Sequence, residues 1–156
     1  MRILAVAQNT FREAVRDKVL YVLLFMAAAA ILGSKILGWI SIGQDIKIIK
    51  SISLGSVSVF GVLIAVFIGT NLIYKEIDKR TIYTIICTPM SRYEFILGKY
   101  LGLAALLAVV TATMTAVATG YVLALGGALG ASFYFAALLI YLKLLLVTAF
   151  ALLLSS

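Results

Sequence analysis

The chain has 156 residues, of which 64% are hydrophobic and 12% are charged. An ordinary soluble domain has about 45–50% apolar and about 25% charged residues, and a globule this small has too little interior to bury the excess. The composition therefore excludes a soluble single domain and indicates a membrane protein.

The net charge of +7 comes from 13 Lys and Arg residues against six Asp and Glu residues. Most basic residues flank long apolar runs, where they face anionic lipid headgroups and set the orientation of the spans. We therefore expect a lipid membrane, and no nucleic acid, as the partner of this charge. The chain has no His, a single Cys and no phosphate-binding G-x-x-x-x-G-K-[ST] loop. We expect no metal site, no catalytic residue and no directly bound cofactor.

The first predicted element is an amphipathic helix over residues 2–18. Leu4, Ala7, Phe11 and Val15 recur at helical spacing, and charged residues occupy other positions around the helix. A helix of this kind lies at a membrane surface with its apolar side chains in the acyl boundary. It leads directly into the first apolar segment.

Four apolar segments are long enough to cross a membrane. We expect spans over residues 19–40, 53–74, 100–125 and 132–154. The third span and the first part of the fourth lie in one uncharged stretch of 43 residues. Three glycines near the middle of this stretch indicate a turn between the two spans. The predicted fold class is an all-α polytopic membrane protein, in which an amphipathic elbow helix precedes four transmembrane helices.

The connectors between the spans differ in their number of basic residues. Residues 2–18 and 75–99 together contain nine Lys and Arg residues, whereas the connector 43–50 contains two. The positive-inside rule therefore places the N-terminus and residues 75–99 in the cytoplasm. We expect a multi-pass protein of the inner, cytoplasmic membrane of the cell.

The segment 75–99 is more organised than a solvated loop. Aliphatic residues give a predicted helix over residues 81–88 an exposed apolar edge. Pro89 ends this helix, because the residue before a proline avoids the helical region. Ser91 and Glu94 have capping-box spacing, which starts the helix that enters the third span. A short helix held between two spans is well placed to bind a cytoplasmic partner.

This segment resembles the cytoplasmic loop of ABC-2 type transporter permeases. In that family an acidic residue and a basic residue followed by Thr precede an aliphatic helix, a Pro-x-Ser-Arg turn and a Gly-Lys pair. The matching residues are Lys75-Glu76, Lys79-Arg80-Thr81, Ile82 to Thr88, Pro89-Met90-Ser91-Arg92 and Gly98-Lys99. The subgroup of copper-enzyme maturation and gliding-type permeases is also similar, at Phe11-Arg12-Glu13, Arg16-Asp17, Phe60-Gly61 and Gly69-Thr70.

The resemblance implies the membrane-spanning permease subunit of an ATP-driven ABC exporter. The implied partners are a cytoplasmic ABC ATPase subunit, which would bind ATP and magnesium, and a second permease copy or homologous half. The chain itself would not be an enzyme. The residues implied to couple to the ATPase are Glu76, Arg80, Thr81, Ile82, Ile85, Thr88, Pro89, Ser91 and Arg92. Such permeases commonly have six spans, so the resemblance also implies that the chain is truncated at its C-terminus.

Lys143 lies near the centre of the fourth expected span. A cation at that depth costs about 2.5–3.5 kcal/mol on insertion scales, which makes the residue a candidate for an intramembrane functional role. Two structural explanations stay open. The helix can shift or tilt so that the side chain reaches the headgroups, or a partner span can cover it.

One side of the third expected span carries Ala108, Ala112, Thr115, Ala116 and Thr119, and the span begins with a G-x-x-x-G pattern. Small side chains let helix backbones approach closely, and Thr hydroxyls bond to neighbouring carbonyls. We therefore expect helix packing on this side rather than a substrate path.

A different class of function stays open on the sequence alone, namely a four-span membrane scaffold or assembly factor without an ATPase partner. An intramembrane enzyme is disfavoured because no His, Cys pair or Asp pair lies within a span. Co-purification of a stoichiometric ATPase, lost on deletion of residues 76–90, would separate a transporter from a scaffold.

Overall fold

The computed structural model describes residues 2–40, 43, 45–78 and 91–155. Within these residues the chain forms α-helices and no strand. The helices are α1 (Arg2–Val15), α2 (Lys18–Gly38), α3 (Asp45–Asp78), α5 (Arg92–Ala124) and α6 (Ala131–Ser155). All except α1 are long and apolar enough to cross a membrane. The predicted all-α polytopic fold with four spans is confirmed, and the helix predicted over residues 81–88 falls outside the described residues.

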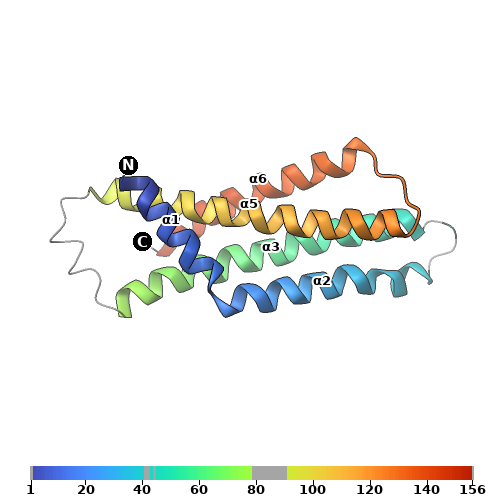
Figure 1. The fold of residues 1–156 in the computed structure, drawn as a ribbon, viewed down its shortest axis with the longest axis horizontal. Helices are drawn as coiled ribbons and strands as arrows, with labels where there is room; N and C mark the ends of the chain where they lie inside the picture. The colour runs from blue at the N-terminus through green and yellow to red at the C-terminus, as the bar shows by residue number, and fades with distance from the viewer. Residues whose placement is uncertain (1, 41–42, 44, 79–90, 156) are drawn as a thin grey trace.

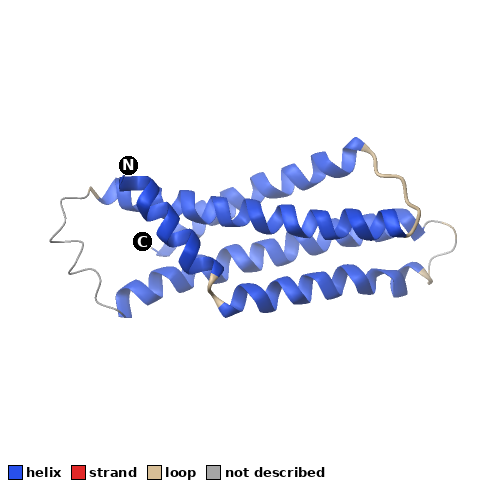
Figure 2. Cartoon of the chain, viewed as in Figure 1, coloured by secondary structure: helices blue, strands red, loops and turns tan. Residues whose placement is uncertain are grey.

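The four long helices run side by side in an elongated bundle, and α1 lies across one end of it (Figure 1). The last turn of α3, the first turn of α5 and both termini lie at the same end, which we call the α1 end. The opposite end holds the connection between α5 and α6, and we call it the turn end. Helix makes up nearly all of the described chain (Figure 2).

Asp17 separates α1 from α2. Its backbone is extended (φ −74°, ψ 125°), and its side chain accepts a hydrogen bond from the Val19 amide at 3.1 Å. This bond satisfies one of the amides that have no partner at the start of a helix. The helix expected over residues 2–18 therefore ends at Val15, because an N-cap residue cannot continue the preceding helix.

α3 extends beyond the expected second span at both ends. It begins at Asp45, so most of the expected connector 43–50 is helical, and it ends at Asp78. The carboxylate of Asp45 in the first turn suits the positive end of the helix dipole. With 34 residues at 1.5 Å each, α3 is about 51 Å long, whereas a hydrocarbon core is about 30 Å thick. The helix therefore projects beyond the hydrocarbon core or crosses it at a tilt.

A glycine turn separates α5 from α6. Gly126 has a positive φ of 75°, a backbone conformation that costs glycine least. Its amide donates to the Leu123 carbonyl at 3.0 Å, and the Gly127 amide donates to the Val122 carbonyl at 3.0 Å. These bonds satisfy carbonyl groups at the end of α5 and allow the chain to reverse.

The largest cluster of buried apolar side chains joins α5 to α3 and α6. Its fully buried members include Ile64, Ile68, Leu103, Leu106, Leu107 and Leu144. Large apolar side chains also cover the outside of the bundle. Phe25 of α2 is 77% exposed and Phe150 of α6 is 64% exposed. An outer surface of this kind is typical of helices surrounded by lipid.

α1 rests on the first turns of α5 through two glycines. A Cβ atom at Gly98 would lie 2.8 Å from the Val6 Cβ, and one at Gly102 would lie 2.6 Å from the Ala7 carbonyl oxygen. Only glycine allows so close an approach between helices. The G-x-x-x-G pattern therefore packs against the amphipathic helix rather than against another span.

Candidate functional site

The two ends of the coupling segment, residues 75–99, which contains the residues implied to contact the ATPase, lie at the α1 end (Figure 1). Glu76 belongs to the last turn of α3, and Ser91 and Arg92 begin α5. The other predicted coupling residues fall outside the described residues, namely Arg80, Thr81, Ile82, Ile85, Thr88 and Pro89. The described structure thus shows where the segment leaves and re-enters the bundle, and the coupling role of its residues stays a prediction.

Ser91 is the N-cap of α5. Its backbone is extended (φ −69°, ψ 145°), and its amide donates to Glu94 Oε2 at 3.4 Å, so the expected capping box is present. The cap fixes the point at which the chain becomes helical after the coupling segment. In the described structure Ser91 therefore has a local role in starting α5.

An ion pair ties the end of α3 to the junction of α1 and α2. Lys75 Nζ lies 3.0 Å from Asp17 Oδ2, and the Asp17 side chain is only 10% exposed. Burial raises the pKa of the Asp17 carboxyl, but the hydrogen bonds from Lys75 and the Val19 amide, with the charge of Lys75, lower it below its usual value of 3.8. Asp17 is therefore ionised at neutral pH and connects three helices.

A polar hollow of about 400 Å³ lies beside this ion pair. Its lining residues are Asn9, Arg12, Glu13, Arg16 and Lys75. Three of the five are cations and one is a carboxylate. Guanidinium and ammonium groups at the end of a membrane bundle suit anionic groups such as headgroup phosphates.

Gly98 and Lys99, the Gly-Lys pair of the sequence resemblance, are both built into the packing of α5. Gly98 contacts α1, as described above. Lys99 is only 6% exposed, and its ammonium lies 4.8 Å from the centre of the Phe95 ring. A cation at this distance is attracted to the face of an aromatic ring. The pair therefore stabilises the start of α5.

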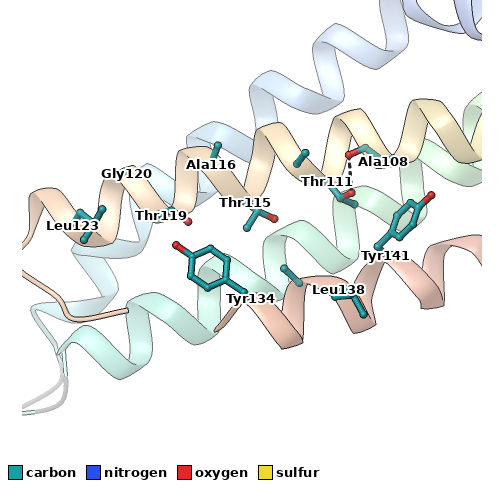
Figure 3. A pocket seen from close by; sticks show the side chains of 12 residues that line it. Ala108, Thr111, Thr115, Ala116, Thr119, Gly120, Leu123, Tyr134, Leu138 and Tyr141 are labelled. Carbon is teal, nitrogen blue, oxygen red and sulfur yellow. Dashed lines mark hydrogen bonds between the residues drawn. The ribbon is translucent and has the colours of Figure 1, made fainter. Parts of the chain in front are cut away.

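An open groove of about 660 Å³ lies between α5 and α6 (Figure 3). Its lining residues are Ala108, Thr111, Ala112, Thr115, Ala116, Thr119, Gly120, Leu123, Tyr134, Ala137, Leu138 and Tyr141. The small residues predicted to share one side of the third span all line it. We expected this side to pack against a helix, but in the described part of the chain it faces the open groove.

Two hydroxyl groups in the groove donate hydrogen bonds to the backbone of α5. Thr111 Oγ1 donates to the Leu107 carbonyl at 2.7 Å, and the Tyr141 hydroxyl donates to the Ala104 carbonyl at 3.2 Å. Thr119 Oγ1 has no hydrogen-bond partner among the described residues. The groove therefore offers a mainly apolar surface, which suits packing against a helix or lipid tails better than binding a charged molecule.

Lys143 does not line this groove. It is the central residue of α6, its side chain is exposed, and its ammonium donates to Ser58 Oγ of α3 at 2.9 Å. Ser58 is thus a partner of the predicted intramembrane residue that sequence reasoning missed. A serine within an apolar span was the signal that could have suggested it.

The comparison with known families agrees with this architecture. A family model described as ABC-2 family transporter protein matches residues 4–156. The chain belongs to the ABC-2 transporter family. A search of curated proteins finds no match to it.

Membership in the ABC-2 family confirms the resemblance stated from the sequence at the level of the family. It supports a permease role, and together with the four apolar helices it makes the chain a multi-pass membrane protein. The subgroup of copper-enzyme maturation and gliding-type permeases stays a prediction, because the family match does not distinguish subgroups.

Proposed function

We propose that this ABC-2 family chain is the permease subunit of an ATP-driven exporter. The observation that carries the proposal is the family match over residues 4–156, which includes all four spanning helices. A separate ATPase would bind ATP and magnesium and supply the catalysis. The chain would work with a second permease copy or a homologous half.

The charge distribution supports a protein of the inner membrane whose α1 end lies in the cytoplasm. Nine of the 13 basic residues belong to residues 2–18 and 75–99, and the described parts of these two segments lie at the α1 end. The turn end carries Lys35, Lys47 and Lys50 together with Asp45. By the positive-inside rule, the N-terminus would therefore be cytoplasmic.

The ATPase would contact the segment between α3 and α5. The charges of Glu76 and Arg80 would orient the contact, and the helix predicted over residues 81–88 would supply its apolar surface. α3 and α5 have 34 and 33 residues, and each runs from this segment to the turn end. A continuous helix moves largely as a unit because its backbone hydrogen bonds link successive turns. Movement of the segment would therefore reach the far side of the membrane.

The proposal is tested with the protein reconstituted in vesicles together with its ATPase. Three substitutions are each expected to abolish coupled ATP hydrolysis without changing the amount of protein inserted in the membrane. They are Glu76→Lys, Arg80→Glu and Ile85→Pro. Lys47→Glu is the matched control, because it also reverses a charge, and Lys47 is exposed and lies at the turn end. It is expected to leave hydrolysis unchanged.

Normal transport-stimulated ATPase activity in all three variants would contradict the coupling assignment. Co-purification gives a second measurement. A stoichiometric ATPase that is lost on deletion of residues 76–90 supports the transporter, and a protein that purifies without any ATPase supports the scaffold instead.

A further inference from the structure

One side of α1 is polar and borders the end of α3. Four residues of α1 are spaced at intervals of three and four positions, so they share this side of the helix. They are Asn9, Arg12, Glu13 and Arg16. Together with Lys75 of α3 they line the polar hollow of about 400 Å³. Pockets that bind small ligands have volumes of about 300–1,000 Å³, so the hollow has room for a ligand group between the two helices.

Packing fixes the direction in which this polar side points. Thr10 and Ala14, on another side of α1, are 4% and 1% exposed. The Thr10 Cβ lies only 2.8 Å from the place that a Cβ atom on Gly102 of α5 would occupy. A rotation of α1 about its axis would break this contact. The polar side is therefore held toward the hollow.

The hollow lies at the depth where the apolar part of the bundle ends. Lys75 is the first charged residue after the uncharged stretch 51–74 of α3. Arg16 lies two residues before Lys18, the last charged residue before the uncharged stretch 19–34 of α2. Leu4 of α1 is 70% exposed, so the same helix also offers an apolar side chain to the acyl region. Lipid phosphate groups are found at this depth of a membrane.

The cations of the hollow outnumber its carboxylate. Arg12, Arg16 and Lys75 face the single acid Glu13, and Asp17 beside the hollow accepts one of the three donors of Lys75. In the described part of the chain, neither guanidinium forms an ion pair or a hydrogen bond. Like charges four residues apart destabilise a helix, so an anion between the two guanidinium groups would relieve their repulsion. The planar fork of a guanidinium matches two oxygens of a phosphate.

We propose that the hollow between α1 and α3 is a binding site for the phosphate group of an anionic phospholipid. Arg12 and Arg16 hold the phosphate from α1, and Lys75 completes the site from α3. A choline headgroup suits the hollow less well, because it carries its own cation, which the three cations of the hollow repel. The bound lipid joins α1 to the end of α3 through a contact that does not use Asp17.

Such a site differs from the general attraction of basic residues to a lipid surface. General attraction depends on the number of cations near the membrane, whereas a site depends on which cations line it. Lys18 provides the comparison, because it is an exposed cation at the same end of the bundle and does not line the hollow.

Native mass spectrometry of the full-length protein, purified in a neutral detergent, tests the proposal. The protein is titrated with dioleoyl-phosphatidylglycerol, with phosphatidylcholine that has the same acyl chains, and with glycerol 1-phosphate, which has the phosphate without the chains. We expect the first phosphatidylglycerol molecule to bind at least about tenfold more tightly than either of the other two ligands.

Charge variants locate the binding. Arg12→Gln and Arg16→Gln are each expected to weaken the binding of the first phosphatidylglycerol about fivefold, because each removes one cation from the site. Lys18→Gln removes a cation outside the site and is expected to change the affinity less than about twofold. Glu13→Gln removes the carboxylate that repels the phosphate, and it is expected to strengthen binding at least about twofold.

The arginine substitutions are expected to leave the fold intact, because both side chains are exposed, and equal thermal midpoints without lipid check this. Three results would overturn the proposal. They are equal affinities for the two lipids, binding of glycerol 1-phosphate as tight as that of phosphatidylglycerol, and losses in Arg12→Gln and Arg16→Gln no larger than in Lys18→Gln. The last result is also expected if another part of the protein fills the hollow. Because the readout does not involve ATP hydrolysis, this test is independent of the proposed ATPase contact.

Discussion

The two ends of the bundle are held together in different ways. At the α1 end, contacts join residues far apart in the sequence, as in the Lys75–Asp17 ion pair and the packing of α1 on Gly98 and Gly102. At the turn end, short connections join neighbouring helices, and the Gly126 turn is local. At the same end, the Lys50 ammonium donates a solvent-exposed hydrogen bond to the Ala128 carbonyl. Contacts between residues far apart in the sequence therefore hold both ends, but those at the α1 end are a part-buried ion pair and close backbone packing. Those at the turn end, among the described residues, are a small apolar cluster around Ile31, Ala118 and Phe133 and hydrogen bonds exposed to solvent.

This difference predicts that the same kind of substitution has a larger effect at the α1 end. Close contacts between backbones cannot absorb an added atom, whereas exposed loops can adjust at little cost. The predictions below compare matched positions, in order of decreasing expected effect.

Gly102→Ala is expected to lower the free energy of unfolding by about 1–3 kcal/mol, because its Cβ would lie 2.6 Å from a backbone oxygen of α1. Gly120→Ala on the same helix is the control, since a Cβ there meets nothing within 4 Å. It is expected to be neutral or stabilising by up to about 1 kcal/mol, because alanine favours helix. Thermal unfolding in detergent and protease cleavage of α1 measure the difference. Equal effects of the two substitutions would contradict the close packing of α1.

Gly126→Ala tests the turn end. A Cβ atom at a φ of 75° strains the backbone and is expected to lower the free energy of unfolding by about 1–2 kcal/mol. The cause would be the backbone alone, because this Cβ atom would meet no other atom within 4 Å. Gly130→Ala in the same connection is the control, because its backbone has no positive φ and it too has open space. The loss is expected in thermal unfolding, with no change in protease cleavage of α1. Release of α1 by this substitution would show that the two ends are not independent.

Asp17→Ala is expected to cost about 1 kcal/mol, since it removes the N-cap of α2 together with the ion pair. Asp17→Asn retains a capping side chain and loses only the charge. It is expected to cost less than about 1 kcal/mol, because Lys75 is 41% exposed and solvent weakens the pair. Thermal midpoints of both variants against the unchanged protein provide the measurement. A larger loss in Asp17→Asn than in Asp17→Ala would contradict the capping role.

The pH dependence of stability separates the charge from the cap. Because folding lowers the pKa of Asp17, its charge stabilises the protein above the usual value of 3.8, and this contribution is lost as the pH falls through the lower folded value. The difference in thermal midpoint between the unchanged protein and Asp17→Asn is therefore expected to shrink below about pH 4. A difference that stays constant down to pH 2 would show that the ion pair is not its cause.

Lys50→Gln is expected to have the smallest effect, below about 0.5 kcal/mol, because its bond to the Ala128 carbonyl is exposed to solvent. The thermal midpoint is again the measurement. A loss larger than that of Asp17→Ala would reverse the proposed ranking of the two ends.

The features that were predictable from the sequence have local causes. Four spanning helices follow from the length of the apolar runs, and the start of α5 follows from the Ser91–Glu94 spacing. The bounds of α1 and α3 were less predictable, and at the end of α1 a single side-chain bond decides where the helix stops. Asp17 caps α2 through Val19, which hydropathy does not reveal.

No local signal showed which polar residues of different helices pair with one another. Asp17 and Lys75 are 58 positions apart, and Ser58 and Lys143 are 85 positions apart. Which of many polar residues meet depends on the arrangement of all the helices, which a single sequence does not specify by periodicity. The α5 side of the groove was predictable, because its small residues share one face of the helix. The α6 side was not, because Tyr134 and Tyr141 line the groove only through the placement of α6.

The position of Asp17 has a consequence for how motion would spread through the protein. One carboxylate begins α2 and also holds Lys75 near the end of α3. A displacement of the end of α3 therefore acts on α2 directly, through a contact outside the apolar core. The first and second spans would respond together to one event at the α1 end, even though no covalent connection joins them there.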